Sequence, residues 1–329
     1  MKIEKELPGV KKNILLKNYT TFRIGGPAKY FFQTKTKRDL ILAVKIAKKF
    51  RLPFFVLGGG SNLLVSDKGF KGLVIKIQNS KFEILNGARR RREGGGRVSS
   101  KIFTEAGTLL RHLVNATTRV GLTGLEWAVG IPGTVGGAVR GNAGAFRKSM
   151  EDIIKTVEAF DTKTGKIKTL KSKDCKFGYR DSIFKKNKNL IILSAMLQLK
   201  KGRHPPATRK KKIKNKIQKN LEQRKRTQPL NFPSAGSVFK NPQGFSTGEL
   251  GEEDKSSSSA FAAARLIEEC GLKGKRIGNV KIFEKHANFI VNLGGGKGKD
   301  VMGLIKIIKN RVKKKFEVVL EEEIQFLGF

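Results

Sequence analysis

The sequence has no long hydrophobic run and very few cysteines. No segment approaches the roughly 18 consecutive apolar residues of a membrane span, and the N-terminus MKIEKELPGV lacks the pattern of a signal peptide. The two cysteines, Cys175 and Cys270, lie far apart and form no C-x-x-C motif. This spacing argues against a disulfide framework and against a zinc site. We therefore expect a soluble, cytoplasmic protein that binds no metal and has no membrane segment.

Acidic residues are also scarce: 27 Asp and Glu stand against 69 Lys and Arg, which leaves a net charge of +42. A charge of this size attracts polyanions. The basic residues are spread widely, however, and only the tracts 89–92 and 200–226 are concentrated. We find neither paired zinc ligands nor the aromatic platforms that are typical of nucleic-acid readers. A lysine-rich solvated surface is the favoured interpretation, and a basic polyanion-binding or nucleic-acid-binding protein is the alternative.

Two common phosphate-binding motifs are missing as well. The glycine run at 58–62, GGGSN, follows a predicted strand over 54–57, but Leu63 rules out G-x-G-x-x-G and no Gly-Lys-Ser/Thr follows. Rossmann and Walker sites are therefore disfavoured. Consecutive glycines after a strand can still direct several N–H groups toward one phosphate. Ser61 and Asn62 would add side-chain hydrogen bonds.

Glycine is abundant in one stretch, 124–146, with the sequence GLEWAVGIPGTVGGAVRGNAGAF. It contains seven glycines and only two charged residues, Glu126 and Arg140. This composition is typical neither of an amphipathic helix nor of a half-buried strand. Glycine allows positive φ angles and lets another group approach the main chain closely. The stretch is either an irregular buried connection or a wall of bare peptide groups that lies against a flat or anionic ligand.

Elsewhere the hydrophobic periodicity predicts an α+β protein of two or three domains. Thr36 and Asp39 have the spacing of a helix N-cap and the acid that follows it. The predicted strands are 28–34, 54–57, 73–77, 82–85, 97–103, 157–161, 167–170, 190–199 and a C-terminal strand within 320–328. The predicted helices are 36–50, 108–118, a basic helix between Pro206 and Pro229, 262–270 and 301–316.

Several motifs follow one another in an order that matches a known family. They are TTFRIGGPA (20–28), VLGGGSNLLVSD (56–67), GLEWAVGIPGTVGGAV (124–139), NAGAF (142–146), FGYRDSIFK (177–185), QPLNFPSAGSVFKNP (228–242), RLIEECGLKGKRIGNVKIFEKHANFIVN (265–292) and LEEEIQFLG (320–328). The series resembles the UDP-N-acetylenolpyruvoylglucosamine reductases, flavoenzymes of peptidoglycan precursor synthesis, over nearly the whole chain. The direct join between the strand ending near Lys200 and the helix before Gln228 resembles the shorter form of the enzyme, which lacks an extra substrate-covering loop.

The resemblance implies an α+β fold with two FAD-binding lobes of the vanillyl-alcohol-oxidase (PCMH) type, at 1–80 and 81–203, and a substrate-binding domain at 204–329. It implies a monomeric enzyme that uses FAD and NADPH. The substrate would be UDP-N-acetylenolpyruvoylglucosamine, whose enolpyruvyl group is reduced to give UDP-N-acetylmuramate. A reduction of this kind builds negative charge beside the substrate carboxylate, so the site needs positive or acidic groups there and a proton donor opposite.

The resemblance also assigns residues to these roles. Ser237 would be the proton donor, while Arg180 and Glu323 would hold the carboxylate and stabilise the enolate-like species. Glu323 is preferred to Glu321 because it directly precedes the predicted strand. The residues that would contact the FAD pyrophosphate are Gly58, Gly59, Gly60, Ser61 and Asn62, and those along the flavin are Gly130, Ile131, Pro132, Gly133, Gly136 and Gly137. Those that would contact the substrate diphosphate are Arg224, Lys240 and Asn241.

The chain departs from the family pattern in a few places. Arg140-Gly141 replaces an aromatic-Met pair, Phe146-Arg147 ends the NAGAF motif, and Ala264 replaces a glycine. The tract 89–96 and the insert 249–259 have no recognised counterpart. His286 is interpreted as a structural hydrogen-bonding residue and not as a base.

Overall fold

A computed structural model describes residues 3–85, 99–201, 205–242 and 262–329. The chain forms two compact units that alternate along the sequence. The first contains residues 1–11, 30–59 and 72–224, and the second contains 12–29, 60–71 and 225–329. Each unit has its own apolar core. The three consecutive lobes expected from the sequence remain a prediction.

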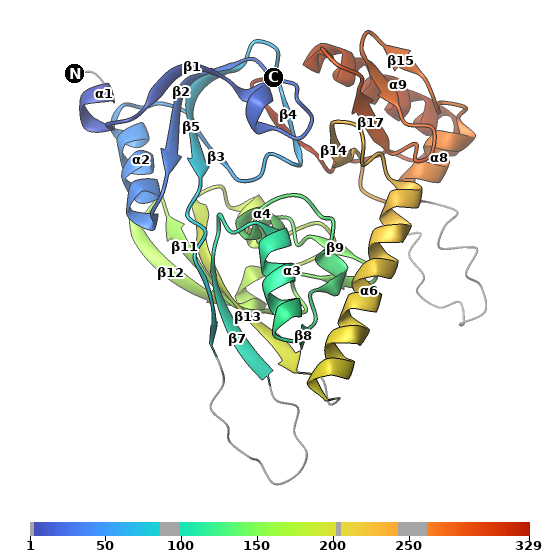
Figure 1. Cartoon of the computed structure of the whole chain (residues 1–329). Helices are drawn as coiled ribbons and strands as arrows, with labels where there is room; N and C mark the ends of the chain where they lie inside the picture. The colour runs from blue at the N-terminus through green and yellow to red at the C-terminus, as the bar shows by residue number, and fades with distance from the viewer. Residues whose placement is uncertain (1–2, 86–98, 202–204, 243–261) are drawn as a thin grey trace. The chain divides into compact units, whose positions relative to one another are not determined.

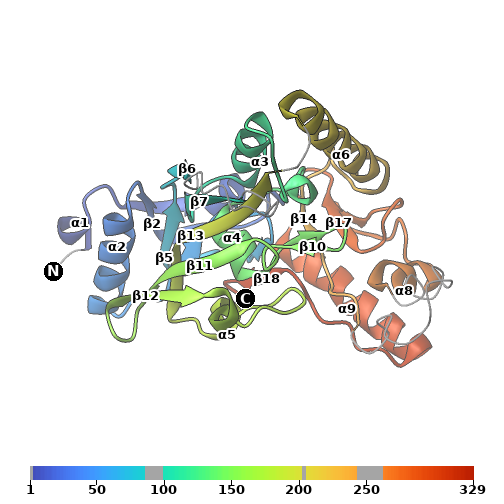
Figure 2. The same ribbon diagram turned by 90° about the horizontal axis from the view of Figure 1, so that it is seen from below.

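A small sheet and a helix contain residues 30–59 of the first unit, whereas most of the first strand of this sheet belongs to the second unit. The sheet has the order β1-β2-β5-β3, and β3 runs parallel to β5. Helix α2 lies beside β2 and β5 (Figures 1 and 2) and buries Leu40 and Val44 among residues of these strands. Its predicted N-cap is confirmed, because Thr36 and Asp39 exchange side-chain and backbone hydrogen bonds of 2.9 and 3.1 Å. The elements are α1 (Ile3–Glu6), β1 (Lys11–Leu15), β2 (Pro27–Thr34), α2 (Lys37–Lys49), β3 (Phe54–Leu57) and β5 (Phe70–Ile77).

A larger antiparallel sheet forms the other part of this unit. Its order is β12-β11-β13-β7-β6, and β8 pairs with the end of β13. The central strand β13 begins with six buried residues, whereas the edge strand β12 is exposed and carries lysines, as protected edges often do. The strands are β6 (Phe82–Leu85), β7 (Ser99–Glu105), β8 (Leu122–Thr123), β9 (Gly144–Ala145), β10 (Lys148–Ser149), β11 (Ile154–Asp161), β12 (Lys166–Lys171) and β13 (Leu190–Lys201). The helices are α3 (Leu110–Arg119), α4 (Val135–Arg140), α5 (Ile183–Lys186) and α6 (Pro206–Thr227).

The second unit is built on an antiparallel sheet of order β14-β17-β16-β15. Helix α9 packs against this sheet and buries residues at helical spacing, including Val301, Leu304, Ile305 and Ile308. A separate parallel pair joins β4 to β18 at the C-terminus. The elements are β4 (Leu63–Val65), β14 (Ser234–Ser237), α8 (Ala263–Glu269), β15 (Arg276–Ile277), β16 (Val280–Ile282), β17 (Phe289–Asn292), α9 (Gly298–Phe316) and β18 (Gln325–Leu327).

Most predicted elements are present within a few residues of their expected ends. The C-terminal strand is shorter than expected, because only Gln325–Leu327 pairs with β4 while the glutamates before it join other partners. No helix in the described part of the chain is both long and apolar enough to cross a bilayer. The tract 89–96 and the insert 249–259 lie outside the described residues.

Candidate active site

The two glycine-rich stretches pack against each other in the first unit. Gly58 and Gly59 follow β3, and a side chain on either would collide with the second stretch. A Cβ on Gly59 would lie 2.5 Å from the Cα of Gly133, and a Cβ on Gly58 would lie 2.7 Å from the Oγ1 of Thr134. The structure therefore brings part of the predicted pyrophosphate loop directly onto part of the predicted flavin wall.

The second stretch contains a short helix that its composition does not suggest. Thr134 caps α4 by accepting a 3.5 Å hydrogen bond from the N–H of Gly137, and Val135 and Val139 are buried. The interpretation that helix is disfavoured throughout 124–146 was therefore wrong for these six residues. The cap and the burial of Val135 and Val139 stabilise the helix, and so short a segment shows no clear periodicity. The threonine before Val-Gly-Gly was the one local signal.

The glycines of this helix serve different purposes. A Cβ on Gly136 would lie 2.8 Å from the Cβ of Ala106, so glycine is required there by the packing of the protein itself. A Cβ on Gly137 would meet nothing closer than the Oγ1 of Thr134 at 3.7 Å, an ordinary contact. The bare backbone at Gly137 therefore has no packing role and can lie against a flat ligand, which fits a flavin.

Asn62 belongs to the second unit, where it is bound to the C-terminal run. Its Nδ2 donates to the carbonyl of Glu323 at 3.1 Å, and its own carbonyl accepts from the N–H of Gln325 at 3.0 Å. Gly60, two residues earlier, has a φ of +65° and accepts from the N–H of Thr21 at 3.1 Å. The backbone hydrogen bonds thus fix the end of the predicted phosphate loop beside Glu323.

Ser237 and Glu323 lie next to each other along paired backbones. Ser237 ends β14 opposite Phe289 of β17, and the N–H of Glu323 donates to the carbonyl of the next residue, Val238, at 2.7 Å. No hydrogen bond joins the Ser237 hydroxyl to another residue in the described ranges. The hydroxyl can therefore orient toward a ligand. Two of the three predicted catalytic residues are brought together here.

The neighbouring glutamates are already engaged elsewhere. Glu321 forms a 3.0 Å ion pair with Lys240, and Glu322 forms a 2.8 Å ion pair with Lys309. Both side chains are therefore held by lysines. The first pair places the Lys240 ammonium on Glu321, whose side chain is 73% exposed. Asn241, the neighbouring predicted substrate ligand, accepts from the N–H of Ala263 at the start of α8 at 3.2 Å.

Arg180 lies in the first unit, in a tight turn with an unusual backbone. Its φ is +54°, a conformation that non-glycine residues rarely adopt, and Gly178 and Asp181 pair across the turn. Its Nη1 donates to the carbonyl of Gly144 at 2.9 Å, and Lys185 donates to its carbonyl at 2.8 Å. Such conformations cost free energy and cluster at functional sites. The turn therefore holds the guanidinium in a defined position.

Arg224 brings a second guanidinium into the same region. It is 8% exposed, near the end of α6, and its guanidinium carbon lies 5.5 Å from the ring centre of Phe146. Burial, together with the positive charge of Arg180, lowers the pKa of Arg224. Phe146 had no role assigned from the sequence. The charge of Arg180 therefore acts on the Arg224 guanidinium, as expected for two like charges in one region.

Comparison with known proteins gives this arrangement a context. A family model described as "FAD binding domain" matches residues 28–171, and a model described as "UDP-N-acetylenolpyruvoylglucosamine reductase, C-terminal domain" matches residues 228–327. The UDP-N-acetylenolpyruvoylglucosamine reductase of Clostridium novyi is 38% identical over 97% of this chain and 92% of its own length. That of Prochlorococcus marinus is 38% identical over 97% of this chain and 98% of its own length. The crystal structure of the Thermus caldophilus enzyme superposes with a TM-score of 0.74 at 34% identity, covering 97% of this chain and 99% of that one.

The chain belongs to the UDP-N-acetylenolpyruvoylglucosamine reductase family. Membership confirms the family expected from the motifs, and it confirms an FAD-binding domain followed by a C-terminal reductase domain. Both glycine stretches fall within the FAD-binding match, and Ser237 and Glu323 fall within the C-terminal match. Arg180 and Arg224 lie in the segment between the two matches.

The imidazole of His286 is the last side chain of interest from the sequence. Burial lowers the pKa of its imidazole, and Nδ1 forms no hydrogen bond within the described structure. The ring packs edge-on against Phe289, with 4.8 Å between ring centres. The ring thus contributes packing, and the expected structural hydrogen bond is not formed by Nδ1 in the described ranges.

Proposed function

We propose that this chain reduces the enolpyruvyl group of UDP-N-acetylenolpyruvoylglucosamine to give UDP-N-acetylmuramate, with NADPH as reductant and FAD as cofactor. The observation that carries the proposal is family membership over 97% of the chain, with Ser237 and Glu323 placed side by side. FAD, when bound, would supply hydride transfer from NADPH to the substrate. The polyanion-binding alternative gains no support from the relatives.

The residues of the chain have separate tasks in this scheme. Gly58–Asn62 binds the FAD pyrophosphate, and the stretch from Gly130 to Gly137 lies along the flavin. Ser237 donates a proton to the substrate carbon from the face opposite the reductant, while Arg180 and Glu323 hold the carboxylate and stabilise its developing negative charge. The like-charged guanidiniums of Arg180 and Arg224 favour the negative groups of the substrate.

Three residues are proposed to bind the substrate diphosphate, and their contacts in the structure support this role to different degrees. Arg224 is buried beside another cation and is well suited to bind an anion. Lys240 would have to leave its ion pair with Glu321. The Asn241 side-chain oxygen already accepts a hydrogen bond from the N–H of Ala263. We further propose a cytoplasmic, monomeric enzyme whose FAD lobes occupy 1–80 and 81–203 and whose substrate domain occupies 204–329.

The two half-reactions test these roles. Flavin reduction by NADPH needs no proton donor to the substrate, so Ser237→Ala should bleach the yellow protein at close to the normal rate. Reoxidation by the enolpyruvyl substrate should slow by roughly 10²–10⁴-fold, the usual contribution of a positioned general acid. Arg180→Gln and Glu323→Gln should likewise spare bleaching and slow reoxidation. Stopped-flow absorbance measures both steps.

A serine on the same strand provides a matched control. Ser234→Ala removes a hydroxyl from β14, leaving intact its carbonyl, which accepts from Thr21 at 2.7 Å. This variant should be normal in both half-reactions. If Ser237→Ala slows reduction by NADPH as much as it slows reoxidation, the serine supports the flavin or the fold, and the proposed role is wrong.

A further inference from the structure

A pocket of about 710 Å³ lies within the first unit, apart from every residue assigned above. Small-molecule sites typically occupy about 300–1,000 Å³. The N–H of Gln78 donates to the carbonyl of Thr34 at 3.0 Å, so the segments that follow β2 and β5 leave the sheet next to each other. The lining residues are Lys35, Thr36, Lys37, Arg38, Gln78, Asn79, Ser80, Lys81 and Glu105.

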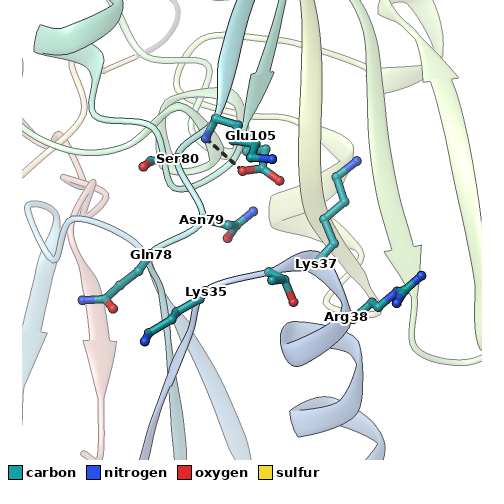
Figure 3. A pocket seen from close by; sticks show the side chains of 9 residues that line it. Lys35, Lys37, Arg38, Gln78, Asn79, Ser80 and Glu105 are labelled. Carbon is teal, nitrogen blue, oxygen red and sulfur yellow. Dashed lines mark hydrogen bonds between the residues drawn. The ribbon is translucent and has the colours of Figure 1, made fainter.

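The amide of Asn79 is the unusual feature of this pocket. The residue is 2% exposed, and neither its Nδ2 nor its Oδ1 has a hydrogen-bond partner among the described residues. Figure 3 shows the amide directed into the space between Glu105 and Lys37. Buried polar groups are nearly always paired, because burial without a partner is unfavourable. A ligand group that both donates and accepts would complete this amide.

The charges around the pocket favour an anion. Lys35, Arg38 and Lys81 form no ion pair with any residue of the described ranges, whereas Lys37 is committed to Glu158 at 2.8 Å. The pocket also includes the N-terminus of the 13-residue helix α2, where the first N–H groups have no acceptor within the helix. Three cations without an ion pair in the described ranges together attract a negatively charged group, whereas the N-terminus of α2 is already capped by Thr36 and Asp39.

Two acidic residues lie among the positive charges of the pocket. The carboxylate of Asp39 is occupied by the N–H groups of Lys35 and Thr36, each at 2.9 Å. Glu105 lines the pocket and is 9% exposed, and its Oε2 accepts from the N–H of Lys81 at 2.9 Å (Figure 3). A carboxylate in this position can accept a hydrogen bond from a hydroxyl group. The pocket therefore combines an amide, a carboxylate and several cations.

We propose that this pocket is a nucleotide site, in which Asn79 pairs with the edge of the base, Glu105 accepts from a ribose hydroxyl, and either Lys35 or Arg38, whose side chains lie on opposite sides of the pocket (Figure 3), binds the phosphate. Asparagine suits the base because its amide offers one donor and one acceptor side by side. The site is separate from the residues proposed for FAD and for the reduced substrate. Its failure would leave the proposed reductase activity untouched.

Titration calorimetry on the full-length, FAD-loaded protein tests the proposal with UMP, AMP and inorganic phosphate as probes. At least one nucleotide should bind saturably and more tightly than phosphate. Asn79→Leu, which fills the space without a polar group, should weaken that binding at least tenfold, and the double variant Lys35→Gln/Arg38→Gln should do the same. Flavin content and the rate of bleaching by NADPH should stay normal in both.

The double variant Lys210→Gln/Lys214→Gln is the matched control, because it removes the same charge from exposed positions on α6. Its nucleotide affinity should equal that of the wild type. Absence of saturable binding, or phosphate binding as tightly as the nucleotides, would overturn the proposal. The proposal would also be overturned if both pocket variants bound nucleotide as tightly as the wild type, or if a folded Asn79→Leu protein lost its FAD. Lys35 and Arg38 are exposed, so their double variant stays informative if Asn79→Leu fails to fold.

Discussion

Replacing Gly59 with alanine tests the packing of the two glycine stretches, which the proposed FAD site requires. The new Cβ would lie 2.5 Å from the Cα of Gly133, and 3.3 and 3.4 Å from its carbonyl carbon and nitrogen. Nonbonded carbons prefer a separation of about 3.5–4.0 Å. All three neighbours are backbone atoms, so no side-chain rotation relieves the overlap and the segments must separate by about 1 Å. Overpacking typically costs about 1–3 kcal/mol, and the upper half of this range is expected here.

The measurement is thermal unfolding of the flavin-free and FAD-loaded protein, together with FAD affinity from flavin fluorescence. A loss of about 2–3 kcal/mol should lower the Tm of the flavin-free Gly59→Ala protein by roughly 4–8 °C. FAD should also bind more weakly, because the phosphate loop has moved. If the variant unfolds at the wild-type temperature and binds FAD normally, the two stretches do not pack as described and the reasoning is refuted.

Gly137→Ala is the informative partner, because it places the same methyl group where the protein leaves room. Its nearest neighbour would be 3.7 Å away, and alanine inside helix α4 favours the helix by about 0.5–1 kcal/mol. The flavin-free Tm should therefore stay the same or rise. Weaker FAD binding at unchanged stability is the result that the proposed contact with the flavin predicts. The pair separates an effect on the fold from an effect on the ligand.

Two further predictions concern one buried side chain in each unit. Burial and the charge of Asp174 raise the pKa of the Cys175 thiol to about 11. Because the folded thiol holds its proton more tightly than the unfolded one, the free energy of unfolding should fall as pH rises from about 9 to 11. Urea unfolding of Cys175→Ala should show a smaller fall over this pH range, and an equal fall in both proteins would be the contrary result. Asn288 accepts a hydrogen bond from the N–H of Phe239 at 2.9 Å and donates one to its carbonyl at 2.8 Å. Asn288→Ala should therefore lower the free energy of unfolding by about 2–4 kcal/mol, because both backbone groups lose their partner. The control Asn279→Ala, at an exposed position, should lower it little, and equal losses in the two variants would contradict this account.

The regular elements were predictable where the spacing of apolar residues agrees with the capping and turn residues at the ends of the segment. The Thr36–Asp39 capping box and the apolar residues after it predicted α2, and the run FFVL predicted β3 at Phe54–Leu57. Helix α4 was missed because its stability comes from tertiary packing and from Thr134, which local glycine content conceals. The interleaving of the units was also beyond prediction. The interleaving depends on hydrogen bonds between residues that are distant in sequence, such as the bond from Asn62 to Glu323.

The arginines of the candidate site show most clearly what only the structure could add. The motif FGYRDSIFK identified Arg180, but nothing in its sequence indicates a left-handed backbone at that residue or a buried Arg224 nearby. Burial and, to a smaller extent, the positive charge of Arg180 lower the pKa of Arg224. A like charge nearby disfavours the charged form of a group. A negatively charged group bound beside Arg224 would reduce the effect of the like charge, which is what the proposed contact between Arg224 and the substrate diphosphate predicts.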